Sequence, residues 1–233
     1  MSTFTHPMRA LVFLALITLP ALPLQADAAT RSYRYTENVS SREGSSLSER
    51  FYSRERYSSA IQREIKKLDD DIVEELPVPI LLGLSLNQIT SDFGDPRDGG
   101  SRSHEGQDLI APRGAFIASP TDAVVTKTGE GGSAGVYVYT ANPGGERFAY
   151  MHLDRVADGV KAGTVLKAGD LIGYVGDSGN AKGGVTHLHF EIREGREAID
   201  PYPRLTGEFT LEQKIDVLKE ILADLLEQQR KLK

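Results

Sequence analysis

The stretch from Leu81 to Pro203 alternates short apolar runs with turn-forming residues, and this pattern restricts the possible folds most strongly. Much of the chain's glycine (23 residues) lies here, and no helical period occurs between the runs. The candidate strands lie at 116–118, 123–126, 136–140, 147–153, 165–166 and 171–175, and the turn 142–145 joins two of them as a hairpin. The sequence therefore predicts a mainly β domain whose antiparallel strands form a sandwich or an open barrel.

The segment THLHFEI (186–192) is the candidate strand with chemically active side chains. Side chains two residues apart share one face of a strand, so His187 and His189 should project together, away from Leu188 and Phe190. Two imidazoles on one face can present a metal ligand beside an acid/base group, although exposed strands also carry histidines. The segment predicts a functional site only in combination with other residues.

His104 and Asp108 form a second candidate pair, in the segment HEGQD. We expect a loop entering a strand here, in which Gly106 lets the chain turn so that both side chains reach one point. Two imidazoles and a carboxylate would leave one coordination position open, as a catalytic zinc site requires. The alternative is a solvent-exposed loop pair without function.

His152 completes the set of four histidines in the β-rich region, and we expect it where the strand containing 148–151 meets a loop. The chain has no cysteine, so a thiolate metal site is excluded and any metal must bind histidines and carboxylates. The net charge of −6 and the lack of a basic stripe argue against nucleic-acid binding.

The first 28 residues are typical of a signal peptide. Arg9 precedes an apolar run at 10–24, and Ala26-Asp27-Ala28 offers a cleavage site after Ala28. An uncleaved membrane anchor is the alternative, but the run is short for a membrane span and contains two prolines. We therefore expect an exported protein without a permanent membrane span. It would lie in the periplasm of a Gram-negative cell, or be secreted or held in the wall of a Gram-positive one.

Two helices are expected to flank the β region. The first begins at Ser46, which is spaced from Glu49 as a capping box, and its apolar face continues to Ile72. The second begins at Thr210, paired with Gln213 in the same way, and carries an apolar stripe at Leu211, Ile215, Leu218, Leu222, Leu225 and Leu232. Such a stripe resembles a short heptad seam. The second helix either packs on the domain or the first helix, or uses residues 211–233 for self-association or for binding a protein partner.

Taken together, residues from about Ile89 to Pro203 resemble the LytM/lysostaphin-type M23 metallopeptidases. The matching segments follow the family's order: ITSDFGDPR (89–97), the H-x-x-x-D of His104 and Asp108, YMHL around His152, VLKAGDLIGYVGDSGNAKGG (165–184), THLHFEI (186–192) and AIDPYP (198–203). The combination of H-x-x-x-D with H-x-H in this context is highly specific. The implied organisation is a signal peptide at 1–28, a flexible lead plus helix at 29–76, a LytM-like (duplicated-hybrid-motif) peptidase β-core at 77–205, and an amphipathic helix at 206–233.

The resemblance also implies roles for the histidines. His104, Asp108 and His189 would bind one Zn²⁺ per chain, and His187 and His152 would be the catalytic pair. Gln107 departs from the family, which usually carries an aliphatic residue there, and its side chain should point away from the metal.

The implied function is hydrolysis of the peptide cross-links of bacterial peptidoglycan, in which metal-bound water attacks the amide carbonyl with histidine assistance. His187, beside His189, is the better candidate for the general base, but the sequence does not decide between His187 and His152. One alternative is a non-catalytic cell-wall-binding regulator that activates another murein hydrolase through its helices. A mononuclear iron oxygenase also uses two histidines and one carboxylate, but its usual cytoplasmic cosubstrate suits an exported protein poorly.

Overall fold

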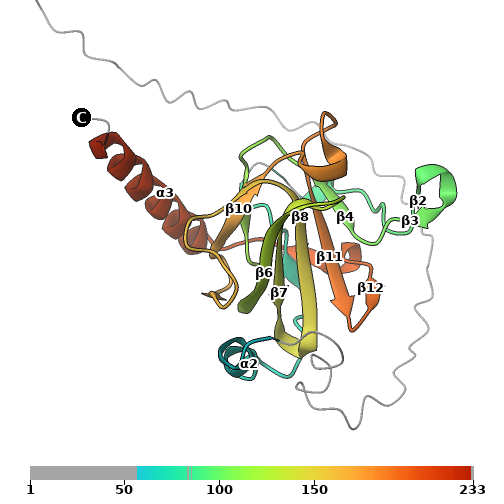
Figure 1. Cartoon of the computed structure of the whole chain (residues 1–233), viewed down its shortest axis with the longest axis horizontal. Coiled ribbons are helices and arrows are strands. Elements are labelled where there is room, and N and C mark those ends of the chain that lie inside the picture. The colour runs from blue at the N-terminus through green and yellow to red at the C-terminus, as the bar shows by residue number, and fades with distance from the viewer. Residues whose placement is uncertain (1–56, 83, 85, 232–233) are drawn as a thin grey trace, which may run out of the picture. The chain divides into compact units, whose positions relative to one another are not determined.

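The computed structural model describes residues 57–82, 84 and 86–231. The signal peptide expected at 1–28 and the capping box expected at Ser46 and Glu49 lie outside these residues. Within the described part, antiparallel strands dominate, which confirms the predicted mainly β fold class (Figure 1). None of the described helices combines the length and the hydropathy needed to span a membrane.

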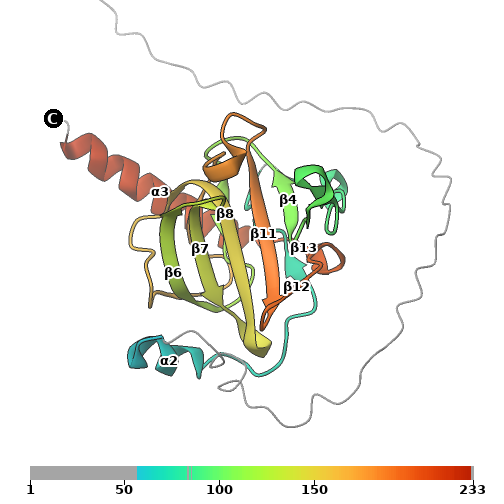
Figure 2. The ribbon, with the colours of Figure 1, turned by 45° about the vertical axis from the view of Figure 1, so that its right-hand side comes forward.

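One large antiparallel sheet holds most of the strands (Figure 2). Its main path runs in the order β12 (Glu197–Ile199), β11 (His187–Glu194), β8 (Glu146–Val156), β7 (Gly135–Ala141), β6 (Ala123–Gly131) and β9 (Val165–Leu166). Three more strands leave this path: β4 (Gln107–Ile110) pairs with β11, and β10 (Leu171–Val175) pairs with β8 and β5 (Phe116–Ala118). Two small sheets pair β1 (Leu76–Pro77) with β13 (Leu205–Gly207) and β2 (Pro96–Arg97) with β3 (Arg102–Ser103).

The predicted strands are present, and several are longer than expected. The hairpin of β7 and β8 turns through the short 3₁₀ segment Pro143–Gly145, as the sequence predicts. Gly144 adopts a φ of +68°, and a Cβ there would lie 2.1 Å from Cγ2 of Ile72. Glycine is therefore required at this turn both by the backbone conformation and by the segment that packs against it.

The core lies on one face of β8 and β11. Leu188, Phe190 and Ile192 of β11 are fully buried, and Phe148 and Tyr150 of β8 contact Phe190 at ring-centroid distances of 5.3 and 5.4 Å. Burial of each large apolar side chain contributes about 1.5–3 kcal/mol relative to exposure. Because side chains alternate along a strand, fixing these residues in the core turns the histidines of β11 to the opposite face.

The strand β8 changes its partner at His152. Met151 pairs with His189 of β11, whereas Leu153 pairs with Val175 of β10. His152 lies between these two ladders and is the non-glycine residue with a positive φ (63°) in the described part of the chain. The expectation that the strand ends at His152 is therefore wrong: a left-handed backbone at this residue redirects the strand, which continues to Val156.

The N-terminal helix is shorter than predicted. The described part contains α2 (Ser59–Ile65), capped by Ser58, whose Oγ accepts a hydrogen bond from the N–H of Ile61 at 3.3 Å. The expected continuation to Ile72 is wrong: the helix ends at Ile65, with Lys66 as its C-cap. Beyond this end, Asp69 makes two further contacts. Its carboxylate accepts from the N–H of Asp71, and its carbonyl accepts from the N–H of Gly144 at 3.0 Å. These bonds hold the segment after α2 against the turn between β7 and β8.

The C-terminal helix α3 (Leu211–Lys231) begins as predicted. Gln213 Oε1 accepts from the N–H of Thr210 at 2.8 Å, and Thr210 Oγ1 accepts from the N–H of Gln213 at 3.2 Å, which completes the capping box. The helix contacts the domain through Val217, which is buried in a cluster with Leu81, Ala118, Ala157, Leu171 and Phe209. The heptad residues Leu211, Ile215, Leu218, Leu222 and Leu225 are exposed instead, so a partner contact through them stays a prediction.

Candidate metal centre and active site

His104, Asp108 and His189 meet at one point. Asp108 on β4 is the direct partner of His189 on β11, and His104 reaches them from the loop before β4. His104 Nε2 lies 3.0 Å from Asp108 Oδ1 and 2.9 Å from His189 Nδ1, and these last two atoms are 2.9 Å apart. His104 is only 5% exposed. The alternative of a solvent-exposed loop pair is therefore wrong.

This donor set fits a single divalent cation. Two imidazole nitrogens and one carboxylate oxygen, each about 3 Å from the others, can all reach an ion that binds such ligands at about 2.0–2.2 Å. Without a cation or a proton between them, the lone pairs of these three atoms would repel one another. In the metal-free protein, bound protons must therefore hold the three side chains together. The arrangement matches the ligand set expected from the sequence.

In each histidine of this set, the ring nitrogen that faces away from the cluster contacts an oxygen atom. The ring of His104 donates from Nδ1 to the carbonyl of Asp92 at 2.8 Å, which leaves Nε2 for a metal. His189 lies the other way round: its Nε2 is 3.0 Å from Glu191 Oε1, and its Nδ1 faces Asp108. Outer contacts of this kind fix the tautomer and the orientation of a ligating imidazole.

Asp108 is also supported from outside the cluster. Its Oδ2 accepts from Nη2 of Arg97 at 2.9 Å, and its backbone N–H donates to Asp92 Oδ1 at 3.2 Å. Asp92 and Arg97 lie in the ITSDFGDPR segment that the sequence associates with the family, but neither was predicted as a site residue. Glu191 was also missed. Its spacing of two from His189 on the same strand face is the signal that could have identified it.

The electrostatics of the metal-free cluster favour bound protons. Burial lowers the pKa of His104, but hydrogen bonds to Asp108 and Asp92 outweigh it and raise that pKa to about 10. The pKa of Asp108 lies well below its usual range: burial acts in the opposite direction, and the hydrogen bonds from His104 and His189 prevail. Binding of a cation must therefore displace a proton from the cluster.

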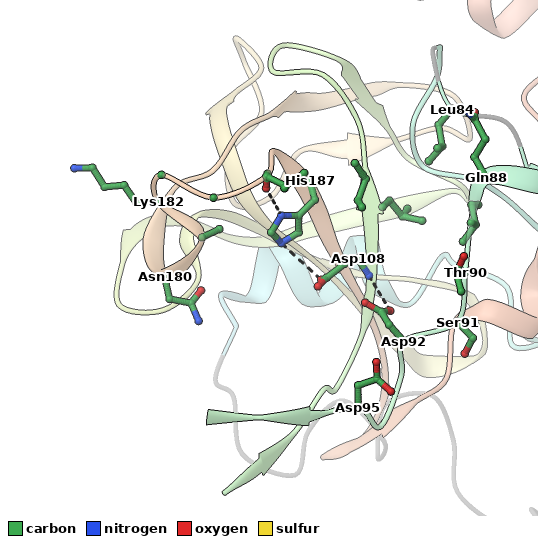
Figure 3. Close-up of a pocket in the computed structure, with 17 residues that line it drawn as sticks. Leu84, Gln88, Thr90, Ser91, Asp92, Asp95, Asp108, Asn180, Lys182 and His187 are labelled. Atoms are coloured by element: carbon green, nitrogen blue, oxygen red, sulfur yellow. Dashed lines mark hydrogen bonds and ion pairs between the residues drawn. The ribbon is translucent and has the colours of Figure 1, made fainter. Parts of the chain in front are cut away.

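His187 and His152 face each other beside the cluster, with ring centroids 5.0 Å apart. His187 donates from Nδ1 to the carbonyl of Val185 at 2.8 Å, and its Nε2 lies 3.7 Å from Asp108 Oδ1 (Figure 3). His152 donates from Nδ1 to the carbonyl of Ser178 at 2.9 Å. A carbonyl can only accept, so Nδ1 carries the proton in both rings and Nε2 keeps its lone pair in the neutral form.

Burial, reinforced by the nearby imidazoles of His187 and His189, lowers the pKa of His152 to about 4. This side chain is therefore neutral at physiological pH. A neutral ring that already donates from Nδ1 has no second proton to give, so it can accept a hydrogen bond or a proton at Nε2.

Two cavities meet at this site, and all five residues line the smaller of the two. One, of about 640 Å³, extends along Leu84, Thr90, Asp92, Asn180 and Lys182 (Figure 3). The other, of about 360 Å³, extends along Arg102, Tyr139 and Met151. Asp108 and His187 line both cavities. A chain-like substrate lying across both would pass directly over the histidines.

Gly106 and Gln107 show how the chain packs beside the cluster where the loop enters β4. Gln107 is fully buried, and its Nε2 donates to the carbonyl of Thr90 at 2.9 Å, so its side chain points away from the cluster as expected. Gly106 is needed for a different reason from the predicted turn. A Cβ at this position would lie 2.6 Å from the carbonyl oxygen of Phe190 and 2.8 Å from His189 Nε2. Only glycine lets the loop pass this close to the imidazole.

Comparison with known proteins places this site in a family. The sequence profile of peptidase family M23 matches residues 102–201, which include all five site residues. The L-Ala–D-Glu endopeptidase of Bacillus subtilis (strain 168) is 33% identical over 139 residues, which are 55% of this chain and 42% of that protein. The peptidoglycan DD-endopeptidase ShyC of Vibrio cholerae is 34% identical over 113 residues, which are 47% of this chain and 25% of that protein.

Among solved structures, LytU is 33% identical to the chain, with a TM-score of 0.44, and the match covers 49% of this chain and 81% of that one. The chain spans less than half the length of the two curated relatives described above. Residues 102–201, which contain the histidine and aspartate cluster, are therefore a peptidase family M23 domain.

Proposed function

We propose that this protein is a zinc-dependent endopeptidase that hydrolyses peptide cross-links of bacterial peptidoglycan. The main supporting observation is the convergence of three metal-binding atoms within 3.0 Å of one another, beside two imidazoles that donate from Nδ1 to backbone carbonyls. Two relatives in the same family are named for cleaving L-Ala–D-Glu bonds and for a peptidoglycan DD-endopeptidase activity.

His104, Asp108 and His189 would hold the zinc through Nε2, Oδ1 and Nδ1. When bound, zinc supplies a Lewis acid that makes water acidic near neutral pH and polarises a carbonyl oxygen. Three protein ligands are the number found in catalytic zinc sites, whereas structural sites usually have four. Asp92, Arg97 and Glu191 would keep the three ligand side chains in place.

His187 and His152 would handle the protons of the reaction. The attacking water gives up a proton, and the leaving amine needs one, so a group that first accepts and then donates is required. Nε2 of His187 is 3.7 Å from Asp108 Oδ1, close enough to serve a water molecule at the cluster. His152 faces His187 and, as a neutral acceptor, would orient the same water.

The two cavities suit a peptide substrate. With Asp108 and His187 lining both, the segments on either side of the scissile amide would occupy one cavity each. The larger cavity carries both carboxylates and an ammonium group, at Asp92, Asp95 and Lys182, which can pair with the charged termini and side chains of a cross-link peptide.

Digestion of purified sacculi by the zinc-loaded protein tests this function. We expect release of soluble muropeptides whose masses, measured by liquid chromatography and mass spectrometry, identify the bond that is cleaved. Chelation should abolish the release, and added zinc should restore it. Failure of zinc-loaded protein to cut sacculi or muropeptides of every common bridge type would refute the proposal.

The control for this experiment is the variant His187→Ala, which keeps all three proposed metal ligands. A regulator that acts by binding the wall and activating another hydrolase should retain its effect in this variant, whereas an enzyme should lose its activity. Export to the periplasm belongs to the same proposal, since it would bring the protein to its substrate. Cell fractionation with an antibody against the C-terminal helix tests that part.

A further inference from the structure

The strand β11 carries four polar side chains in a row on one face: His187, His189, Glu191 and Arg193. The first two belong to the site described above. Glu191 is a carboxylate with only 7% of its side chain exposed. A buried carboxylate is costly unless it is paired and hydrogen-bonded, so its partners indicate why it is there.

Both oxygens of Glu191 are occupied. Oε1 lies 3.0 Å from Nε2 of His189, and Oε2 accepts from Nε of Arg193 at 2.6 Å. The guanidinium of Arg193 also donates to the carbonyl of Arg196 at 3.2 Å and contacts the carboxylate of Glu105. Glu105 is the residue next to His104 in the chain. Arg193 therefore connects Glu191, which contacts the candidate ligand His189, to the loop that carries the candidate ligand His104.

The contact with Glu191 decides which nitrogen of His189 can bind a metal. An ionised carboxylate only accepts, so Nε2 of His189 must carry the proton and Nδ1 keeps the lone pair. The loop at Gly106 packs against the same Nε2–Cε1 edge of the ring, where a Cβ would approach to 2.8 and 2.9 Å. The ring is thus confined by a hydrogen bond and by steric contact, with Nδ1 directed at Asp108 and His104.

We propose that Glu191, held by Arg193, is a positioning residue that fixes the tautomer and the orientation of His189 for metal binding. It acts through His189 and is not itself one of the three proposed metal ligands. The inference rests on the proposed function, because it assumes that His189 is a metal ligand. Removing such an outer carboxylate weakens metal binding by about 10- to 100-fold in comparable sites.

The test compares zinc affinity, measured by competition with a chromogenic chelator, in the wild type and in Glu191→Gln and Glu191→Ala. We expect the dissociation constant to rise about 10-fold for Gln and up to about 100-fold for Ala. Glu146→Gln is the matched control, because Glu146 is another carboxylate with 7% exposure that pairs with an arginine, Arg204, at 2.6 Å. Its zinc affinity should match that of the wild type even if its thermal stability falls.

A second measurement needs no variant. Nitrogen-15 NMR of histidine-labelled wild-type protein with zinc should show one imidazole that binds through Nδ1 and keeps a slowly exchanging proton on Nε2. Zinc binding through Nε2 of His189 would overturn the inference, and so would unchanged affinity in both Glu191 variants. If the wild type itself binds no zinc, the proposed function fails first. If the Glu191 variants do not fold, the NMR result alone tests the inference.

Discussion

Asp108 lies directly opposite His189 in the register of β4 and β11, although 81 residues separate them in the chain. The backbone ladder therefore sets the distance between two of the three candidate ligands. A slip of one residue would move either side chain to the core face, where Leu109 and Leu188 now lie. The geometry of the candidate metal centre therefore depends on strand register.

Substitution of a candidate ligand should remove metal binding without unfolding the sheet. We expect Asp108→Ala to lose measurable zinc affinity and all detectable hydrolysis of sacculi. Zinc at 100 times its dissociation constant stabilises a folded protein by about 2.7 kcal/mol, so the wild type should melt at a higher temperature with zinc than without it. The variant should show no such rise in differential scanning fluorimetry. A normal rise would exclude Asp108 as a ligand.

Substitution of His187 or His152 should impair catalysis without weakening metal binding. Loss of a general base or acid reduces kcat by about 10²- to 10⁴-fold. We expect His187→Ala and His152→Ala each to fall in this range while zinc affinity stays within about 2-fold of the wild type. A fall in zinc affinity that matches the loss of kcat would instead make the residue a metal ligand.

The strands that surround the site were predictable because their alternation is local. THLHFEI shows its two faces directly, and β11 begins at His187 and buries Leu188 and Phe190 as expected. The capping box at Thr210 was also visible, because it needs only two residues at a fixed spacing. These features depend on neighbours within a few positions.

The features that the sequence did not reveal depend on contacts across the chain. The bond between Asp69 and Gly144 holds the segment that follows α2, and no local pattern encodes that partner. The left-handed conformation of His152 occurs where β8 exchanges β11 for β10 as its partner. Asp92 supports both His104 and Asp108 from 12 and 16 residues away, a role that only the folded loop shows.

Gly106 should be intolerant of the smallest side chain. In Gly106→Ala the new methyl group would press on the carbonyl of Phe190 and on the ring of His189, at distances below 3.0 Å. Crowding of this kind costs about 1–3 kcal/mol and should rotate the imidazole. We expect a lower melting temperature and weaker zinc binding.

Gly184→Ala is the matched control for this substitution, because its added Cβ would meet only the carbonyl of Ala181, at 3.1 Å. Its zinc affinity should equal that of the wild type. If Gly106→Ala also binds zinc normally, the contact between this loop and His189 does not position the ring.

The metal-free protein should lose stability as the pH rises above neutrality. His104 has a folded-state pKa of about 10 and an ordinary value of 6.5, so between these two the folded protein binds more protons than the unfolded chain. The free energy of unfolding therefore falls with rising pH across this window, and the contribution of His104 is complete only below about 6.5. Urea unfolding of chelator-treated protein at pH 6, 8 and 10 measures it.

The variant His104→Gln isolates this effect from other titrating groups. It lacks the proton, so its stability difference from the wild type should be largest at pH 6 and should shrink towards pH 10. In the same interval the apparent affinity of the wild type for zinc should increase, because each ion has to displace fewer protons as the pH rises. A stability difference that stays constant from pH 6 to 10 would mean that His104 is not held protonated by Asp108 and Asp92, and the metal-free cluster would then need another source of cohesion.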